Sequence, residues 1–210
     1  PCESILEIGC FDRPSIEFLN KNRKIDYADY LSKDELIKRA KNHKGRNPNN
    51  VPNIKYVLSE GLEQIDEVYD AVVSSSCIEH VPDLISHINQ VIRITNGRGA
   101  YLFSVPDKRL TFDHFNSETT IIDVLTAYLE KRKRPSLVSV LEHYCFTSQE
   151  WFLGKKQFKN HIKKSLNMPK INKIFERYQS SEYIDVHCWN FTPKSMKNII
   201  SLLVELGYIK

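Results

Sequence analysis

The stretch Ile5-Leu6-Glu7-Ile8-Gly9 is a short apolar strand that ends on a glycine. Glycine lets the backbone turn sharply and approach a ligand closely, because it has no Cβ. A second β-rich run covers residues 24–30, and its Asp29 lies twenty positions after Gly9. A carboxylate at the end of the second strand is placed to accept hydrogen bonds from both hydroxyls of a ribose. These residues together predict a nucleotide-binding turn.

The first half of the chain alternates short β-rich runs with helical stretches, which is typical of a parallel sheet with crossover helices. Ser32 is a good cap for a helix, and Asn96-Gly97 is a good signal for the end of one. We therefore predict an α/β fold with a doubly wound, mostly parallel, Rossmann-like sheet. Its strands are expected at residues 4–8, 24–30, 54–58, 70–74 and 100–105, and its helices at residues 14–22, 33–41 and 82–95.

The alternation stops after Pro106. Residues 110–182 are basic and aromatic with helical periods, which indicates a helical insertion or lid after strand five. Residues 1–109 form the expected cofactor-binding core. Residues 183–210 are expected to complete it with a capped helix from Thr192 to Gly207 and the start of a last strand at 208–210. Because strands lie so near both ends, we expect the sequence to be a piece of a longer chain.

Charge and hydropathy indicate whether the protein binds membranes or nucleic acids. No apolar run approaches the roughly 18 residues that span a bilayer, and no signal peptide is recognisable, so we expect a cytoplasmic protein without a membrane partner. The net charge of +4 is spread over many lysines. The basic run at residues 131–134 reads best as a solvated helix end, with an anionic partner as the alternative. This pattern does not favour nucleic acid binding, and no oligomeric state follows from it.

Five scattered cysteines show no C-x-x-C or Cys/His ligand spacing. The sequence therefore predicts reduced thiols, no disulfide framework and no metal site.

The residues after Gly9 indicate which kind of nucleotide the turn can bind. A dinucleotide site needs G-x-G-x-x-G so that a pyrophosphate can lie against a helix N-terminus. Here Phe11 and Pro14 stand at the second and third glycine positions, and Phe11 would obstruct the close backbone approach. There is also no G-K-[ST] phosphate loop. This favours a phosphate-free adenosine ligand, of which S-adenosylmethionine is the obvious one.

Several segments, in this order, resemble the motifs of class I S-adenosylmethionine-dependent methyltransferases. The resemblance covers residues 3–115 well and 183–207 loosely, and it points to a bacterial subgroup that often reads LEIGP-x-x-x-P and V-P-D-K-R-x-T-F-D. The segments are Leu6-Glu7-Ile8-Gly9 with Asp12-Arg13-Pro14, Tyr27 to Ser32, Asp70 to Ser75 running into Ile78 to Asp83, and Val105-Pro106-Asp107-Lys108-Arg109 followed by Thr111-Phe112-Asp113.

The resemblance implies a cofactor site at the ends of the strands. Glu7 and Gly9 would meet the methionine end of the cofactor and Asp29 its ribose. Glu60, Gly61 and Leu62 would flank the adenine, although an aspartate is common near that position. Ser75 follows strand four in the same site. Some magnesium-binding members have E-x-x-E-H after this strand. Ser76 replaces the first glutamate, so we expect no metal here.

Methyl transfer from a sulfonium is an in-line displacement, so positioning supplies much of the catalysis. An oxygen or nitrogen acceptor that carries a proton must also lose it to a base. The catalytic candidates are His80, Asp107, Asp113 and His114, and Arg109 could bind a polar acceptor. Asp113 and His114 are adjacent and could form a carboxylate–imidazole couple that orients a base. Other interpretations remain open: a capping role for His80, an ion pair of Asp107 with Arg109, and packing roles for His143 and His187.

We therefore predict an S-adenosylmethionine-dependent methyltransferase that acts on a small polar acceptor. A sugar or glycan precursor is suggested by the resemblance alone. A methyltransferase-like interaction module without catalysis is one alternative, because Phe11 and Ser76 depart from the family pattern. A nicotinamide-dependent oxidoreductase is the other, and the missing glycines oppose it.

Overall fold

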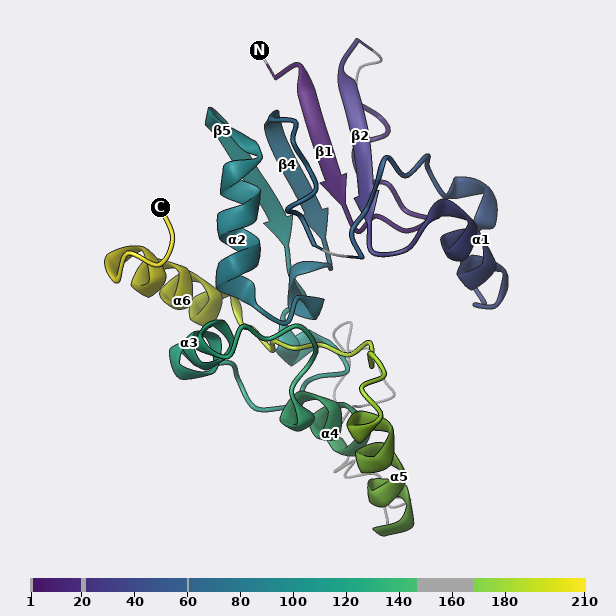
Figure 1. The fold of residues 1–210 in the computed structure, drawn as a ribbon, viewed down its shortest axis with the longest axis vertical. Helices are drawn as coiled ribbons and strands as arrows, with labels where there is room; N and C mark the ends of the chain where they lie inside the picture. Colours follow the sequence, from purple (N-terminus) through teal and green to yellow (C-terminus); the bar gives the residue numbers. More distant parts are fainter. Residues whose placement is uncertain (1, 20–21, 60, 147–167) are drawn as a thin grey trace. The chain divides into compact units, whose positions relative to one another are not determined.

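The computed structural model describes residues 2–19, 22–59, 61–146 and 168–210 (Figure 1). The chain divides into two compact units. The sheet unit comprises Pro1–Ile78 and His87–Ser104, and the helical unit comprises Glu79–Ser86 and Val105–Lys210. The three-part domain division expected from the sequence stays a prediction.

A parallel five-stranded sheet forms the centre of the described sheet unit, in the order β3-β2-β1-β4-β5. Every neighbouring pair is parallel; in the register, Ile5 lies opposite Ile25 on one side and Ala71 on the other. The strands are β1 (Ser4–Ile8), β2 (Lys24–Asp29), β3 (Tyr56–Val57), β4 (Tyr69–Ser75) and β5 (Thr95–Ser104). This confirms the predicted α/β fold class with a Rossmann-like sheet.

Both faces of the sheet are covered, as parallel sheets require. Leu6 and Ile8 pack on one face in a cluster that includes Val91. Ile5 packs on the opposite face with Ile16. Because β1 lies between β2 and β4, the strand order reverses there. The carboxyl ends of these strands are where ligands bind in such sheets.

Two helices follow strands of the sheet. Helix α1 (Lys33–Lys41) has the bounds expected from the sequence, because Ser32 and Glu35 form a capping box at its first turn. Helix α2 (Leu84–Arg93) is shorter than the predicted 82–95. It buries four of the five apolar positions that indicated it, and only Ile92 is exposed; the buried ones are Leu84, Ile85, Ile88 and Val91. The short 3-10 turn η1 (Pro48–Asn50) lies in the loop before β3.

The helix predicted at residues 14–22 is wrong, since none of its described residues is helical. The segment makes separate turns instead, closed by bonds from Arg13 N to Cys10 O and from Leu19 N to Ile16 O. Ser15 is held by the carboxylate of Glu7. Ile16 of this segment nevertheless packs against the sheet.

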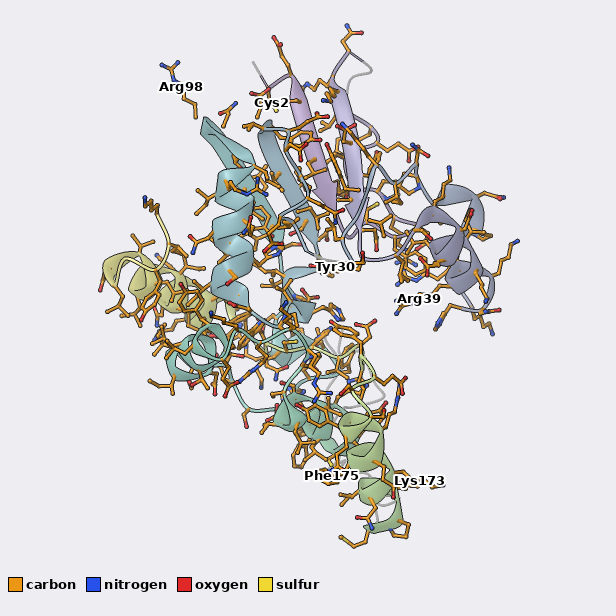
Figure 2. The ribbon with its side chains drawn as sticks, viewed as in Figure 1. Cys2, Tyr30, Arg39, Arg98, Lys173 and Phe175 are labelled. Carbon is orange, nitrogen blue, oxygen red and sulfur yellow. The ribbon has the colours of Figure 1, made fainter. Side chains whose placement is uncertain are left out.

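Strand β5 begins earlier than predicted and contains a bulge. Tyr69 pairs with Thr95, whereas Ala71 pairs with Ala100, so two steps along β4 correspond to five along β5. Residues 96–99 occupy this bulge, with Arg98 exposed at its tip (Figure 2). The expected helix stop at Asn96-Gly97 therefore lies inside a strand, after a helix that already ends at Arg93. Strand β3 is shorter than the predicted 54–58.

The described part of the helical unit contains helices and 3-10 turns. Val140, Ile184 and Val186 form a buried cluster in it, flanked by aromatic residues of α4 and α5, which contact each other. Helix α6 begins after Thr192, whose side chain accepts from Ser195 N, as the sequence predicted. The elements are η2 (Ile78–His80), η3 (Lys108–Leu110), α3 (Ile121–Leu129), α4 (Leu137–Phe146), α5 (Met168–Gln179) and α6 (Pro193–Glu205).

The strand expected at residues 208–210 is wrong, because these residues form a turn and an irregular end. Within the described ranges, no helix is both long enough and apolar enough to cross a bilayer.

Candidate functional site

Gly9 turns the chain directly after β1. Its φ is +74°, and a Cβ at this position would lie 2.7 Å from Sγ of Cys77. Its amide donates to the carbonyl of Ala28 over 2.8 Å, which ties the turn to β2. The sharp turn expected from the sequence is present. It needs glycine because of its left-handed backbone and the close contact with Cys77.

Glu7 is the acidic residue of β1 and is only 1% exposed. Its Oε1 accepts hydrogen bonds from Ser15 N at 2.8 Å and from Ser15 Oγ at 2.6 Å. Its Oε2 is buried and has no hydrogen-bond partner within the described part of the chain. A buried carboxylate oxygen without a donor is costly, so this atom is suited to accept from a ligand.

Asp29 ends β2 and is 7% exposed. Its Oδ2 accepts from the amide of Phe11 at 3.3 Å, and its Oδ1 accepts from the amide of Leu31 at 3.4 Å. Burial raises the pKa of Asp29, against the opposing effect of these two amides. The carboxylate thus faces the turn after Gly9, where the sequence predicted it to meet a ribose.

Phe11 lies in this turn with a φ of +52°. The guanidinium of Arg46 lies over its ring, 4.7 Å from the centroid, and also pairs with Asp12 Oδ1 over 2.7 Å. The amide of Phe11 donates to Asp29, so it is already engaged and does not point at a phosphate site. Side chains thus fill the turn at the position where a dinucleotide site needs glycine.

The other expected cofactor residues are distributed differently. Glu60 lies outside the described residues. Gly61 has a φ of +95°, and Leu62 is buried in the core, where its carbonyl accepts from Arg93 Nη2 over 2.8 Å. Ser75 Oγ is 2.9 Å from Ser104 Oγ, at the carboxyl ends of β4 and β5. Their contacts with an adenine stay predictions.

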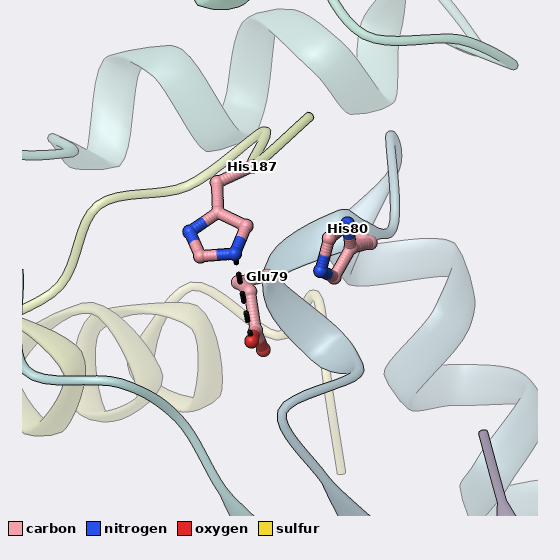
Figure 3. A group of neighbouring side chains, drawn as sticks. All are labelled: Glu79, His80 and His187. Atoms are coloured by element: carbon pink, nitrogen blue, oxygen red, sulfur yellow. Dashed lines mark ion pairs between the residues drawn. The ribbon is translucent and has the colours of Figure 1, made fainter. Parts of the chain in front are cut away.

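The helical unit brings together a cluster of acidic and histidine side chains from segments far apart in the sequence. His187 Nδ1 is 2.6 Å from Asp113 Oδ2. On its other side, His187 Nε2 is 4.0 Å from Glu79 Oε1, as the dashed line in Figure 3 shows. His80 packs edge-on against His187, with ring centroids 4.7 Å apart. His80 Nδ1 lies 2.9 Å from Asp185 Oδ1.

Asp113 and Glu79 are both almost completely buried in this cluster. Asn116 Nδ2 donates to Asp113 Oδ1 over 3.0 Å, which fixes the carboxylate against His187. Burial raises the pKa of Glu79, although His187 and His80 counteract this. The cluster therefore combines two imidazoles and three carboxylates, some buried and some partly exposed to solvent. They are His80, His187, Glu79, Asp113 and Asp185.

Asp107 and Arg109 form the ion pair that was one of the two interpretations of these residues. Arg109 Nη2 is 2.6 Å from Asp107 Oδ2, and this pairing with Arg109 lowers the pKa of Asp107. Asp107 also caps η3 by accepting from Arg109 N. His114 Nδ1 lies 3.0 Å from the carbonyl of Arg109, so it belongs to this loop. The suggested Asp113–His114 couple is wrong, because Asp113 binds His187 instead.

No protein-family model matches the chain, and no curated protein matches it. Its fold is similar to solved methyltransferases. One is a S-adenosylmethionine-dependent methyltransferase from Clostridium acetobutylicum ATCC 824, at 17% identity and a TM-score of 0.39, with 52% of this chain and 46% of that chain covered. Another is the CcbJ methyltransferase from Streptomyces caelestis, at 15% identity and a TM-score of 0.38. That comparison covers 57% of this chain and 52% of the other chain.

The plantazolicin methyltransferase BpumL, in complex with SAH, is similar over more of this chain. It has 12% identity and a TM-score of 0.42, and the comparison covers 98% of this chain and 56% of that chain. The chain spans about half the length of the structures that it matches. At these identities the likeness concerns the fold alone.

His187 is the functional candidate that the sequence interpretation missed. A single histidine near aromatic residues suggests a side chain that only packs in the core. More than one hundred positions also separate His187 from Glu79 and His80. Backbone bonds join the two segments: Cys188 N donates to Glu79 O at 2.7 Å, and Trp189 Nε1 donates to Val81 O at 2.6 Å. No local sequence pattern predicts that these two segments lie together.

Proposed function

We propose that the chain is an S-adenosylmethionine-dependent methyltransferase, with its cofactor site at the carboxyl ends of β1 and β2. The observation that carries the proposal is the pair of buried carboxylates, Glu7 and Asp29, on either side of the Gly9 turn. Oε2 of Glu7 has no hydrogen-bond donor among the described residues, so it suits the ammonium of the methionine end. Asp29 suits the two ribose hydroxyls.

The surroundings of Phe11 support a nucleoside without phosphates. Its amide is engaged by Asp29, and Arg46 covers its ring. A dinucleotide would need free amides and glycine at this turn. For this reason we do not favour a nicotinamide-dependent oxidoreductase.

The proposed acceptor is a small polar molecule, and a sugar or glycan precursor is the class suggested by the resemblance. A hydroxyl acceptor must lose its proton during transfer. We assign this task to the histidine and carboxylate cluster of the helical unit, which includes the predicted His80 and Asp113. Arg109 is less suited to bind the acceptor, because its guanidinium is already paired with Asp107.

Calorimetric titration of the full chain with S-adenosylmethionine, S-adenosylhomocysteine and NAD tests the cofactor. We expect S-adenosylhomocysteine to bind, and Asp29→Asn or Glu7→Gln to weaken it roughly 10- to 100-fold, since each removes a charge-assisted hydrogen bond. Asp66→Asn, at an exposed carboxyl of the same unit, should bind as the wild type. If the folded wild type binds NAD alone, or neither sulfur nucleotide, the proposal is wrong.

The acceptor is tested separately, by release of S-adenosylhomocysteine in the presence of a panel of sugars and sugar nucleotides. We expect turnover with at least one of them. Tight cofactor binding without release from any member of the panel would contradict the sugar acceptor while leaving the cofactor assignment intact.

A further inference from the structure

We infer that Glu79, His80 and His187 form a binding site for a divalent transition-metal ion. One ligand atom from each of the three residues lies within 4.8 Å of the others. Figure 3 shows the three side chains converging from the η2 turn and from the segment before α6. All three belong to the helical unit, so the site does not depend on the placement of the sheet unit.

The tautomer of His187 is set by Asp113. Nδ1 lies 2.6 Å from a carboxylate that accepts but cannot donate, so Nδ1 carries the proton and Nε2 has its lone pair available. His80 has a carboxylate at the same ring position, with Nδ1 2.9 Å from Asp185 Oδ1. Histidines that bind metals usually donate their other ring N–H as His187 does to Asp113, which fixes the ring and raises its basicity. The contact of His80 with Asp185 is an ion pair and not an aligned hydrogen bond.

The carboxylate of Glu79 also indicates a cation at this position. It is 1% exposed, and neither of its carboxylate oxygens makes a hydrogen bond to any described residue. Its Oε1 faces the Nε2 of His187 at 4.0 Å, so two groups with lone pairs face each other in a buried place. Burial of an unpaired carboxylate costs several kcal/mol in general, and a cation between the two groups removes that cost.

The site is built into the backbone. Glu79 O accepts from Cys188 N, and Trp189 Nε1 donates to Val81 O, so the two ligand-bearing segments cannot separate without breaking buried hydrogen bonds. Asn116 and Thr111 hold the carboxylate that orients His187. Supporting interactions of this kind are what hold ligands in place around a metal.

The donor set selects the class of metal. Two imidazoles and one carboxylate suit Zn²⁺, Mn²⁺ and similar first-row ions, whereas Mg²⁺ prefers oxygen ligands. Ligand atoms around tetrahedral Zn²⁺ are about 3.3 Å apart at ordinary bond lengths, so the side chains need to close in by about an ångström. Three protein ligands also leave a position open, as in catalytic metal sites. A role for that position in deprotonating an acceptor hydroxyl rests on the proposed function.

A proton is the competing occupant. An imidazolium at His187 could lie between Asp113 and Glu79 without any metal. The two occupants differ in a measurable way, because only a metal site takes up an ion with fixed stoichiometry and shows nitrogen coordination.

The test uses the full chain, stripped with a chelator and then titrated with Mn²⁺ and with Zn²⁺ in the absence of cofactor. We expect one ion per chain and, for bound Mn²⁺, pulsed electron paramagnetic resonance that shows imidazole nitrogen coupled to the ion. Glu79→Gln and His187→Gln should abolish binding, and Asp113→Asn should weaken it roughly 10- to 100-fold. His43→Gln and Glu205→Gln, at exposed positions, should bind as the wild type.

The inference is overturned if the folded wild type binds no ion stoichiometrically, or if bound Mn²⁺ shows no nitrogen coupling. It is equally overturned if Glu79→Gln and His187→Gln retain full affinity. The nitrogen coupling needs no variant, so the test holds even where a substitution prevents folding. Since no cofactor is present, failure of metal binding is distinguishable from failure of the methyltransferase assignment.

Discussion

Asp113 and His187 are hydrogen bonded over 2.6 Å, although 74 residues separate them in the sequence. Asp113 is 2% exposed and is bonded on its other oxygen by Asn116. The pair therefore joins the loop after η3 to the segment before α6. It is both a structural link and the element that orients one imidazole of the cluster.

Replacing Asp113 with asparagine should destabilise the protein by about 1–3 kcal/mol, because a buried charge-assisted hydrogen bond is lost. The asparagine oxygen can still accept from His187 Nδ1, but the amide then presents an NH2 group to Asn116 Nδ2, where Asp113 offers an acceptor. Urea denaturation of the wild type, Asp113→Asn and the exposed control Asp66→Asn measures this. An unchanged free energy of unfolding in Asp113→Asn would show that the link contributes nothing to stability.

Glycine substitutions should separate backbone strain from crowding in the sheet unit. Gly9→Ala meets both a positive φ and the nearby Sγ of Cys77, whereas Gly45→Ala meets a positive φ in open space. Gly97→Ala meets neither. We expect losses of stability in the order Gly9, Gly45, Gly97, with about 1–2 kcal/mol for the left-handed backbone alone. Thermal or urea unfolding gives the ranking. Equal losses of stability at Gly9 and Gly45 would mean that the side chain of Cys77 can move away from the added Cβ without cost.

The stability of the sheet unit should fall as the pH is lowered below about 6.5, because of His87. Burial lowers the pKa of this histidine to about 4, and its Nε2 lies 3.2 Å from the hydroxyl of Tyr101. Between these two values the unfolded chain takes up a proton that the folded chain does not. The free energy of unfolding should therefore decrease by at most about 1.4 kcal/mol per pH unit.

Urea denaturation at a series of pH values from 7 to 4 checks the role of His87. His87→Gln should reduce the slope, and His43→Gln, at an exposed position, should leave it unchanged. A slope that is the same in all three proteins would rule out His87 as its source.

The capping box of α1 should contribute about 1 kcal/mol. Ser32 N and Oγ both donate to Glu35 Oε2, at 2.9 and 2.6 Å, and the Ser32 side chain accepts from Glu35 N. Ser32→Ala should therefore lower the free energy of unfolding by about that amount, measured by urea denaturation. Lys33→Ala, one residue later, keeps the box and should have little effect. A loss of the same size in both variants would contradict a specific role of the cap.

Elements with local signals were predictable from the sequence. The strand at residues 4–8 and the helix at residues 33–41 have the expected bounds, because an apolar run and a capping box are encoded in adjacent residues. The segment at residues 14–22 was not predictable in this way. Pro14 suits the first turn of a helix, but bonds from Ser15 to Glu7, eight positions earlier, favour turns.

The candidate sites differ in the same respect. Gly9 and Asp29 could be found from the sequence, because each follows a recognisable strand. The partnership of Asp113 with His187, and of both with Glu79, depends on three segments that only the tertiary fold brings together. Sequence neighbours suggested His114 as the partner of Asp113, whereas His114 instead lies against the carbonyl of Arg109.

The bulge at residues 96–99 has a consequence for how the chain can be modified. From Ala100 onward, β5 stays in step with β4 up to the pair of Ser75 and Ser104, whatever path the three surplus residues take. Gly99 is packed against the carbonyl of Asp70, but Gly97 has open space around it. Additional residues inserted between Gly97 and Arg98 would thus lengthen the exposed bulge without displacing the paired part of the strand. This makes the bulge a suitable attachment point for a spectroscopic label or an affinity tag.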